Sequence, residues 1–382
     1  MIDSSQSGKD KVVARAALSN IKDKTVEITL KASAPTLDKQ IKHNENGIWG
    51  VVGDNQIGDK VEYRLITRVP DTTGYNEYTY IIHDKMTEGL TFNEDSVEIY
   101  VGEEKNKKNK LDKNYYEVKT VNSEDETFNI SIKILDGIKE NKFKAEEKLY
   151  IYYTATLNEK ALIAKDSNDN TAYLEYSNNP YDQPNYQPEN ENNGSVDKTP
   201  EITVKDYTFQ LNIDKVDDND QPLGKVEFSL SRDGNEIYFN KVEGDEAKYI
   251  VCAEKHDHGQ KQANCKKDLI TAENGKLQII GLDDNVEYTL KETKTLDGYT
   301  GINPIKFKIT ANYDGSQITT IITDNEHIKT PEGGFILETK VVNIKGQKLP
   351  ETGGIGTKIF TVVGLGLMIV SGGALYIRRR TN

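Results

Sequence analysis

The stretch Val61-Glu62-Tyr63-Arg64-Leu65-Ile66-Thr67-Arg68-Val69 largely alternates apolar and polar side chains over nine residues. This period of two is typical of a β-strand with one face in a core and the other in water. Similar alternation recurs between clusters of Gly, Asn and Asp, at residues 78–82, 150–157, 171–176, 209–213, 305–309 and 318–322. We therefore predict an all-β protein built of tandem Ig-like, Greek-key β-sandwiches. One short helix is expected at residues 158–165.

The composition excludes several classes of function. The 382 residues include 62 acidic and 49 basic side chains, a formal charge of −13, which disfavours binding to nucleic acid. Two Cys and five His are too few for a zinc-rich module or a disulfide-built scaffold. The sequence contains no P-loop, no dinucleotide fingerprint and no Ser/His/Asp set. We expect no cofactor, no metal and no enzyme that turns over.

The C-terminal end contains a membrane-spanning pattern. Residues 359–377 form an apolar run of nineteen residues without a charge, and Arg378-Arg379-Arg380 follows it. Such a run can cross a bilayer, with the arginines on the cytoplasmic side. A simple membrane anchor is one interpretation. Directly upstream, however, stands Leu349-Pro350-Glu351-Thr352-Gly353.

This pentapeptide, the apolar run and the basic tail together resemble the LPXTG sorting signal of Gram-positive surface proteins. The resemblance implies that a sortase cleaves between Thr352 and Gly353 and transfers the Thr352 carbonyl to an amine of peptidoglycan or of another subunit. It also implies a secreted, cell-wall-anchored protein whose membrane insertion is transient. The first residues carry no secretion signal. We therefore expect that a signal peptide and a further N-terminal domain are missing.

The composition suggests five segments. Residues 1–34 are expected to be the remnant of the missing domain, with its last strand near 24–31. A Pro- and Asn-rich linker is predicted at 181–204. It separates one sandwich at 35–180 from another at 205–346, and the sorting signal occupies 347–382.

Each predicted sandwich points one Lys, one acid and one Asn toward its core. A residue has roughly an even chance of facing inward, so a single case would mean little. Two complete sets of Lys, acid and Asn are less easily explained by chance, because Lys comes first and Asn last in both. Lys42 competes with Lys39, but it is out of phase with Leu37 and Ile41. The inward residues are Lys39, Asp84 and Asn170 in the first sandwich, and Lys215, Glu292 and Asn343 in the second.

Burial would allow these residues to react with one another. A buried Lys loses its proton easily and becomes a nucleophile, while a buried carboxyl can stay protonated and polarise the Asn carbonyl. The product is an amide between Lys Nζ and Asn Cγ, formed once with loss of ammonia.

The same residues carry a family resemblance. Residues 35–180 resemble the CnaA-like domain of Gram-positive backbone pilins, and residues 205–346 resemble a CnaB-type domain. The resemblance implies isopeptide bonds Lys39–Asn170 and Lys215–Asn343, promoted by Asp84 and Glu292, in a fimbrial shaft subunit that supports adhesion. The matching segments are 35–39, 58–63, 83–90 and 170–180 in the first domain, and 215–217, 223–228, 288–293 and 340–343 in the second.

Some signals leave alternatives open. Polymerising pilins use a lysine in a YPKN-like motif, which is absent here, so Lys31 is only a candidate for that role. A monomeric wall-anchored adhesin that binds a host or matrix ligand is therefore the alternative function. Cys252 and Cys265 favour a disulfide over a Cys/His metal site, because the spacing fits no common zinc pattern.

Overall fold

The computed structural model describes residues 34–43, 47–178, 196–253 and 265–346. Its regular structure is almost entirely β-strand, so the predicted all-β class is confirmed. The one α-helix in these ranges is α1 (Ile134–Lys139), and the short 3-10 helices are Glu94–Ser96, Lys107–Asn109 and Lys113–Tyr115. The helix expected at 158–165 is wrong: the segment forms turns, because the Leu162 amide donates to the Asn168 side chain instead of a helical carbonyl.

The first sandwich consists of two sheets that face each other across an apolar core. One sheet has the order β2-β1-β4-β10-β6, with β7 also on β10, and the other has the order β3-β13-β11-β5-β9-β8, with β12 also on β11. The strands of the first sheet are β1 (Asp38–Lys42), β2 (Trp49–Gly50), β4 (Lys60–Arg68), β6 (Leu90–Phe92), β7 (Glu98–Val101) and β10 (Lys148–Leu157). Those of the second are β3 (Val52–Asp54), β5 (Tyr80–Met86), β8 (Tyr116–Thr120), β9 (Phe128–Ile132), β11 (Asn168–Ser177), β12 (Val196–Lys198) and β13 (Ile202–Tyr207).

The second sandwich has sheets of order β17-β18-β20-β14-β26-β22, with β25 on β26, and β16-β15-β21-β23-β24, with β19 on β15. Its first and last long strands, β14 and β26, are parallel neighbours. The first sheet contains β14 (Phe209–Asp217), β17 (Phe239–Lys241), β18 (Lys248–Val251), β20 (Lys276–Leu282), β22 (Tyr299–Thr300), β25 (Ile328–Lys329) and β26 (Leu337–Lys345). The second contains β15 (Glu227–Arg232), β16 (Asn235–Glu236), β19 (Leu269–Ile270), β21 (Glu287–Lys294), β23 (Ile305–Asp314) and β24 (Gln317–Thr323).

The expected linker at 181–204 needs correction. Residues 196–204 contribute β12 and the first half of β13, and both strands pair with β11 of the first sandwich. Residues 205–207, expected in the second sandwich, complete β13 and run parallel to β3. Burial of Val204 and Tyr207 explains why this segment joins the first core. The rest of the expected linker lies outside the described residues.

Thr208 alone therefore connects the last strand of the first sandwich to the first strand of the second. It is fully buried, its hydroxyl donates to the Leu282 carbonyl at 2.9 Å, and its own carbonyl accepts from the Ala164 amide at 2.9 Å. Because this single buried residue is hydrogen-bonded to both sandwiches, we expect their relative orientation to vary little.

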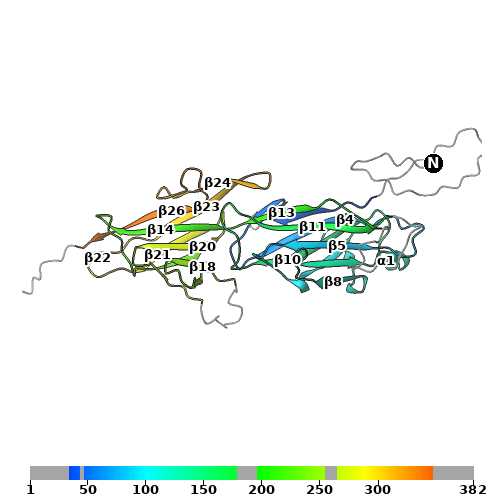
Figure 1. Ribbon diagram of the computed structural model, residues 1–382, viewed down its shortest axis with the longest axis horizontal. Coiled ribbons are helices and arrows are strands. Elements are labelled where there is room, and N and C mark those ends of the chain that lie inside the picture. Colours follow the sequence, from blue (N-terminus) through cyan, green and yellow to red (C-terminus); the bar gives the residue numbers. More distant parts are fainter. Residues whose placement is uncertain (1–33, 44–46, 179–195, 254–264, 347–382) are drawn as a thin grey trace, which may run out of the picture.

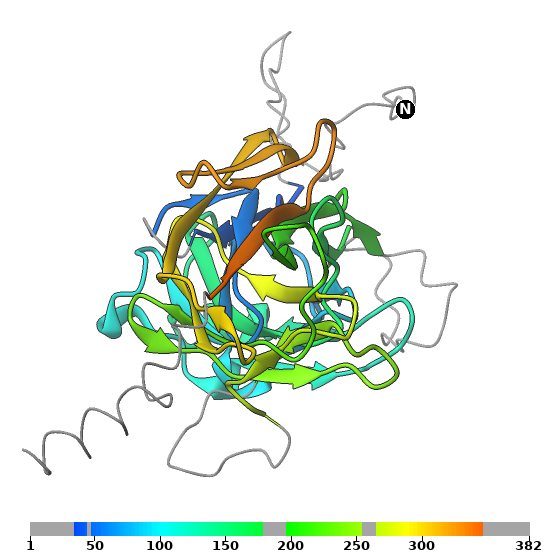
Figure 2. The ribbon, with the colours of Figure 1, turned by 90° about the vertical axis from the view of Figure 1, so that its left-hand side faces the viewer.

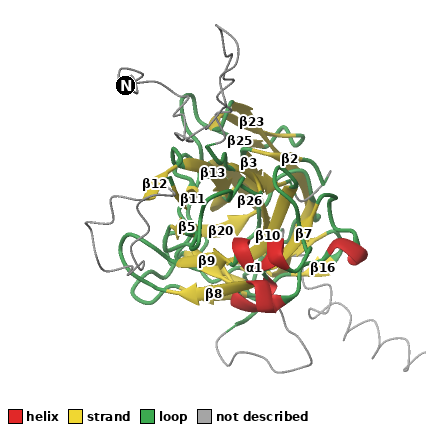
Figure 3. Cartoon of the chain, turned by 90° about the vertical axis from the view of Figure 1, so that its right-hand side faces the viewer, coloured by secondary structure: helices red, strands yellow, loops and turns green. Residues whose placement is uncertain are grey.

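The two sandwiches lie end to end along the long axis of the molecule (Figure 1). Seen from the two ends, their strands overlap in one roughly round cross-section (Figures 2 and 3). The helix α1 lies at the end of the first sandwich away from the second (Figures 1 and 3). At the junction Ile57 packs on Gly281, whose backbone has φ +95°; a Cβ there would lie 2.6 Å from Ile57 Cδ1. Glycine is thus required for the close approach.

Several predicted features fall outside the described residues: the candidate Lys31, the strand at 24–31, the sorting pentapeptide 349–353 and the apolar run 359–377. Within the described ranges, no helix has both the length and the apolar character needed to cross a membrane.

Candidate functional site: two buried lysine clusters

Lys39, Asp84 and Asn170 meet in the interior of the first sandwich. Lys39 projects from β1 in one sheet, whereas Asp84 on β5 and Asn170 on β11 project from the other sheet. All three side chains are buried. Lys39 Nζ lies 2.6 Å from Asp84 Oδ2 and 2.6 Å from Asn170 Oδ1. The inward phase predicted for these residues thus brings the amine, the acid and the carboxamide into direct contact.

Sequence reasoning missed a fourth member of this cluster, Tyr153 on β10. Its hydroxyl donates to Asp84 Oδ2 at 2.6 Å. It also accepts from Lys39 Nζ at 2.9 Å and from Asn170 Nδ2 at 3.2 Å. The alternation within residues 150–157 puts Tyr153 on the inner face, but many tyrosines share that property, so pattern alone does not single out this hydroxyl.

The surroundings of the first cluster are aromatic and buried. The Tyr63 ring stacks on Tyr153 at 5.3 Å, and Lys39 Nζ lies 5.8 Å and 5.6 Å from the centres of these rings. Burial lowers the pKa of Lys39, although the Asp84 carboxylate opposes the shift. Burial likewise raises the pKa of Asp84, against the opposing effect of Lys39. Both shifts favour the uncharged pair, a neutral amine beside a protonated acid.

Lys215, Glu292 and Asn343 meet in the second sandwich with a different topology. Lys215 and Asn343 stand on the parallel neighbours β14 and β26 of one sheet, where Asp217 pairs with Asn343, and Glu292 on β21 faces them from the other sheet. Lys215 and Asn343 are fully buried, and the Glu292 side chain is 2% exposed. A bond here would join two strands of one sheet, whereas the Lys39–Asn170 bond would join two sheets.

The second cluster is less tightly closed than the first. Lys215 Nζ lies 3.9 Å from Glu292 Oε2 and 3.3 Å from the Val341 carbonyl oxygen. Asn343 Nδ2 donates to Glu292 Oε1 and to Thr295 Oγ1, each at 2.7 Å. Burial lowers the pKa of Lys215 to about 8, while the charge of Glu292 works in the opposite direction. A substantial neutral fraction of this amine therefore exists near neutral pH.

The rival lysine and the cysteines occupy contrasting positions. The Lys42 side chain is 31% exposed and pairs with Glu62 at 2.6 Å, so it lies at the surface and does not reach the buried cluster. Cys252 and Cys265 form a disulfide with a Cα–Cα distance of 6.3 Å beside β17 and β18.

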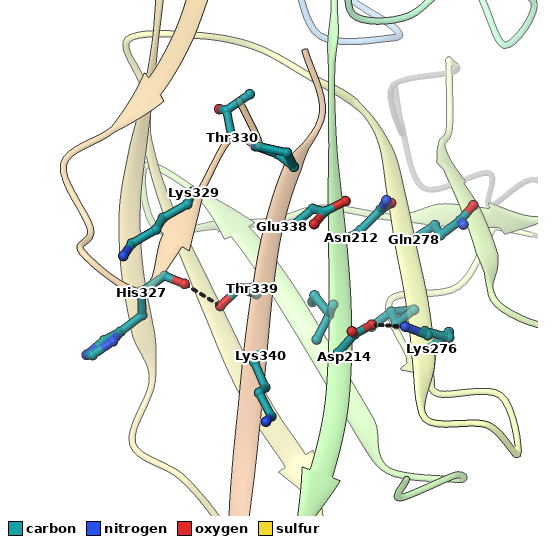
Figure 4. Close-up of a pocket in the computed structure, with 13 residues that line it drawn as sticks. Asn212, Asp214, Lys276, Gln278, His327, Lys329, Thr330, Glu338, Thr339 and Lys340 are labelled. Atoms are coloured by element: carbon teal, nitrogen blue, oxygen red, sulfur yellow. Dashed lines mark hydrogen bonds and ion pairs between the residues drawn. The ribbon is translucent and has the colours of Figure 1, made fainter. Parts of the chain in front are cut away.

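The adhesin alternative calls for a binding surface, and one polar cavity of about 720 Å³ lies over β14, β20, β25 and β26 (Figure 4). Asp214 and Lys276 form an ion pair across it at 2.6 Å, and the Thr339 hydroxyl donates to the His327 carbonyl. Its lining is mostly charged and polar, and His327 is its one aromatic side chain.

Comparisons with known proteins agree with this architecture. Residues 209–326 match the SpaA prealbumin-like fold domain, and residues 341–382 match the LPXTG cell wall anchor motif. The trypsin-resistant surface T6 protein of Streptococcus pyogenes serotype M6 is 27% identical over 392 residues, covering 92% of this chain and 70% of the relative.

Solved structures share the fold at lower identity. The 35 kDa C-terminal fragment of the major pilin of Streptococcus agalactiae superposes with a TM-score of 0.54 at 20% identity, over 81% of this chain and 99% of the fragment. The T6 backbone pilin of serotype M6 Streptococcus pyogenes gives a TM-score of 0.51 at 20% identity, over 83% and 71% of the two chains. The chain is thus a cell-wall-anchored surface protein with a prealbumin-like domain and an LPXTG anchor motif; its sequence is similar to that of the T6 surface protein, and its fold is similar to that of solved Gram-positive backbone pilins.

Proposed function

We propose that this chain is a shaft subunit, joined by a sortase to other subunits or to peptidoglycan, whose two sandwiches are each locked by an intramolecular Lys–Asn isopeptide bond. The observation that carries the proposal is the buried contact of Lys39 with Asp84 and Asn170, each at 2.6 Å. A stable ion pair would need neither the carboxamide nor such complete burial, whereas amide formation needs both.

In the first sandwich, neutral Lys39 Nζ attacks Asn170 Cγ while protonated Asp84 polarises the carbonyl oxygen. The Cγ–Nζ bond forms and the Cγ–Nδ2 bond breaks. The proton that Nζ loses passes through Asp84 and the Tyr153 hydroxyl to Nδ2, which leaves as ammonia. The hydroxyl suits this relay because it contacts the acid at 2.6 Å and the leaving nitrogen at 3.2 Å. Asp84 ends in its starting state, and the protein reacts once.

In the second sandwich, Lys215 and Asn343 undergo the same condensation, with Glu292 as the acid. Glu292 Oε1 and Thr295 Oγ1 already hold the amide group of Asn343, each at 2.7 Å. Closing the remaining gap requires Lys215 Nζ to leave the Val341 carbonyl, which it contacts at 3.3 Å. We therefore expect this bond to form more slowly than the first.

The two bonds explain how such a subunit would resist tension. Lys39 and Asn170 are 131 residues apart, so the bond would close a long loop and restrict the unfolded chain. By analogy with disulfides, a loop of this size contributes about 4–5 kcal/mol to stability. Tension along the chain would also pass through a covalent bond instead of sheet hydrogen bonds.

Intact mass spectrometry of the purified full chain tests the bonds. The observed mass should fall short of the sequence mass by two ammonia molecules. Lys39→Met and Lys215→Met should each restore one ammonia relative to their own sequence masses. The matched control is Lys42→Met on the same strand, which should still lack two. A wild-type chain with its full sequence mass would refute the proposed locking.

Polymerisation requires a separate test, because it depends on residues outside the described ranges. Co-expression with a pilus sortase should produce a ladder of covalent multimers, which Lys31→Ala should abolish if Lys31 is the acceptor amine. A chain that sortase attaches only to peptidoglycan, and that binds a host or matrix ligand as a monomer, would favour the adhesin alternative.

A further inference from the structure

A cluster of acidic side chains lies at the junction of the two sandwiches. Asp54 ends β3 of the first sandwich, and Asp283 and Asp284 follow β20 of the second. All three are almost completely buried. One carboxylate oxygen of each lies within 4.8 Å of the corresponding oxygens of the other two. Docking of the sandwiches therefore creates a group of carboxylates that neither sandwich holds alone.

The carboxylates use part of their bonding capacity on protein groups. Asp54 Oδ2 accepts from the Tyr313 hydroxyl at 3.2 Å and lies 3.4 Å from His43 Nδ1. Asp284 Oδ2 accepts from the Ala311 amide at 3.2 Å. The other oxygens, Asp54 Oδ1 and Asp284 Oδ1, are buried and accept no hydrogen bond from any described residue.

Positive charge near the cluster is scarce. Arg232 contacts Asp283 but also pairs with Asp59 at 2.6 Å, so its charge is shared. Asp206, on the neighbouring strand β13, adds a further buried carboxylate, whose Oδ2 also lacks a described partner. Several negative charges cannot remain buried together without a compensating cation or bound protons.

We propose that Asp54, Asp283 and Asp284 bind a calcium ion between the two sandwiches. Ca²⁺ takes oxygen ligands at 2.3–2.6 Å, so ligands on opposite sides of the ion stand about 5 Å apart, and a cluster within 4.8 Å can surround it. Mg²⁺ demands about 2.0–2.1 Å and a stricter octahedron. The unpartnered oxygens of Asp54 and Asp284 supply one ligand from each sandwich.

Such an ion would couple the two halves of the molecule. The buried residue Thr208 already connects the two sandwiches through the chain. An ion with ligands from both sandwiches would add a second connection. This site is separate from the turn at Asp217–Asp220, which resembles a calcium loop but has Phe228 where the twelfth-position Glu would stand.

Titration calorimetry of the full chain, freed of metal with EDTA, tests the proposal with CaCl₂ as the probe. The wild type should bind one Ca²⁺ and gain several degrees of melting temperature as Ca²⁺ is added, because the ion binds only the folded form. Asp54→Asn with Asp284→Asn should weaken Ca²⁺ binding at least tenfold. Asp95→Asn, which neutralises an exposed acid of the first sandwich, is the control and should bind normally.

A second readout separates lost binding from lost folding. Without calcium, the double variant should melt at or above the wild-type temperature, since the substitutions relieve repulsion between buried carboxyls. The single variant Asp284→Asn serves if the double variant does not fold. The proposal is wrong if the wild type shows no saturable Ca²⁺ binding at millimolar concentration, if the variants bind equally well, or if Mg²⁺ alone binds.

Discussion

Tyr153 places one hydroxyl against the amine, the acid and the leaving nitrogen of the first cluster. Tyr153→Phe keeps the ring stacked on Tyr63 but removes these contacts. We expect formation of the Lys39–Asn170 bond to slow by about a hundredfold, the lower end of what a positioned proton-transfer group contributes. The measurement is the bonded fraction, by intact mass, at fixed times after synthesis in a cell-free system.

The matched control is Tyr152→Phe. Tyr152 is adjacent in sequence but lies on the opposite face of β10, against Trp49 and Tyr100. This variant should form the bond at the wild-type rate. Equal rates for all three proteins would mean that the Tyr153 hydroxyl only fills space.

The second cluster has a pH dependence whose sign follows from Lys215. Its pKa is lowered to about 8, and only the neutral amine attacks, so the reactive fraction rises from about a tenth at pH 7 to about nine-tenths at pH 9. Glu292→Gln should make bond formation slow enough to follow. Because the Glu292 charge raises the pKa of Lys215, the half-maximal pH in this variant should lie at or below 8.

Intact mass at fixed times, in a Lys39→Met background, reports this reaction alone. A rate that becomes half-maximal near 10.5, the ordinary lysine value, would show that Lys215 is not desolvated before it reacts.

Among the elements, β17 and β18 lie beside the Cys252–Cys265 disulfide, and we predict that it stabilises them. Cys252 follows β18, and Cys265 precedes the bridge between Lys266 and Phe239 of β17. The bond closes a loop with a sequence separation of 13, a size for which a disulfide contributes about 3 kcal/mol. Replacing both cysteines with serine should lower the free energy of unfolding of the second sandwich by about that amount, measured by urea denaturation. Reductant should shift the wild-type midpoint equally; an unchanged midpoint would contradict the prediction.

The alternation of side chains located the long strands well, because each has one face in a core. The expected strands at 61–69, 150–157 and 171–176 correspond to β4, β10 and β11. The same parity placed Lys39 and Asn170 inside the first sandwich. These features depend on the local period of the chain, which a sequence displays directly.

Features set by docking could not be predicted in this way. Residues 202–205 alternate like any strand, and only pairing with β11 shows that this segment belongs to the first sandwich. Asp54 and Asp283 are far apart in the chain and become neighbours only where the sandwiches meet. Which inward tyrosine reaches Lys39 likewise depends on how the two sheets face each other.

For the whole molecule, the proposed bonds predict an unusual response to force. In single-molecule stretching, the wild type should not release the 127 residues between Lys215 and Asn343, because the bond removes them from the path of tension. Lys215→Met should release them and lengthen the chain by roughly 400 Å at full extension. The control, Lys225→Met, replaces a lysine whose side chain is 72% exposed and should behave like the wild type. Release of this length by the wild type would contradict the prediction.

The parallel pairing of β14 and β26 has a geometric consequence for any filament of such subunits. The chain enters the second sandwich at one end and leaves it at the opposite end, because β14 and β26 run in the same direction along the long axis (Figure 1). If the first and last strands were antiparallel, the chain would leave the sandwich at the end where it entered. In a filament, the chain would therefore continue in one direction from each subunit to the next. Each added subunit would lengthen the filament by the full length of this sandwich.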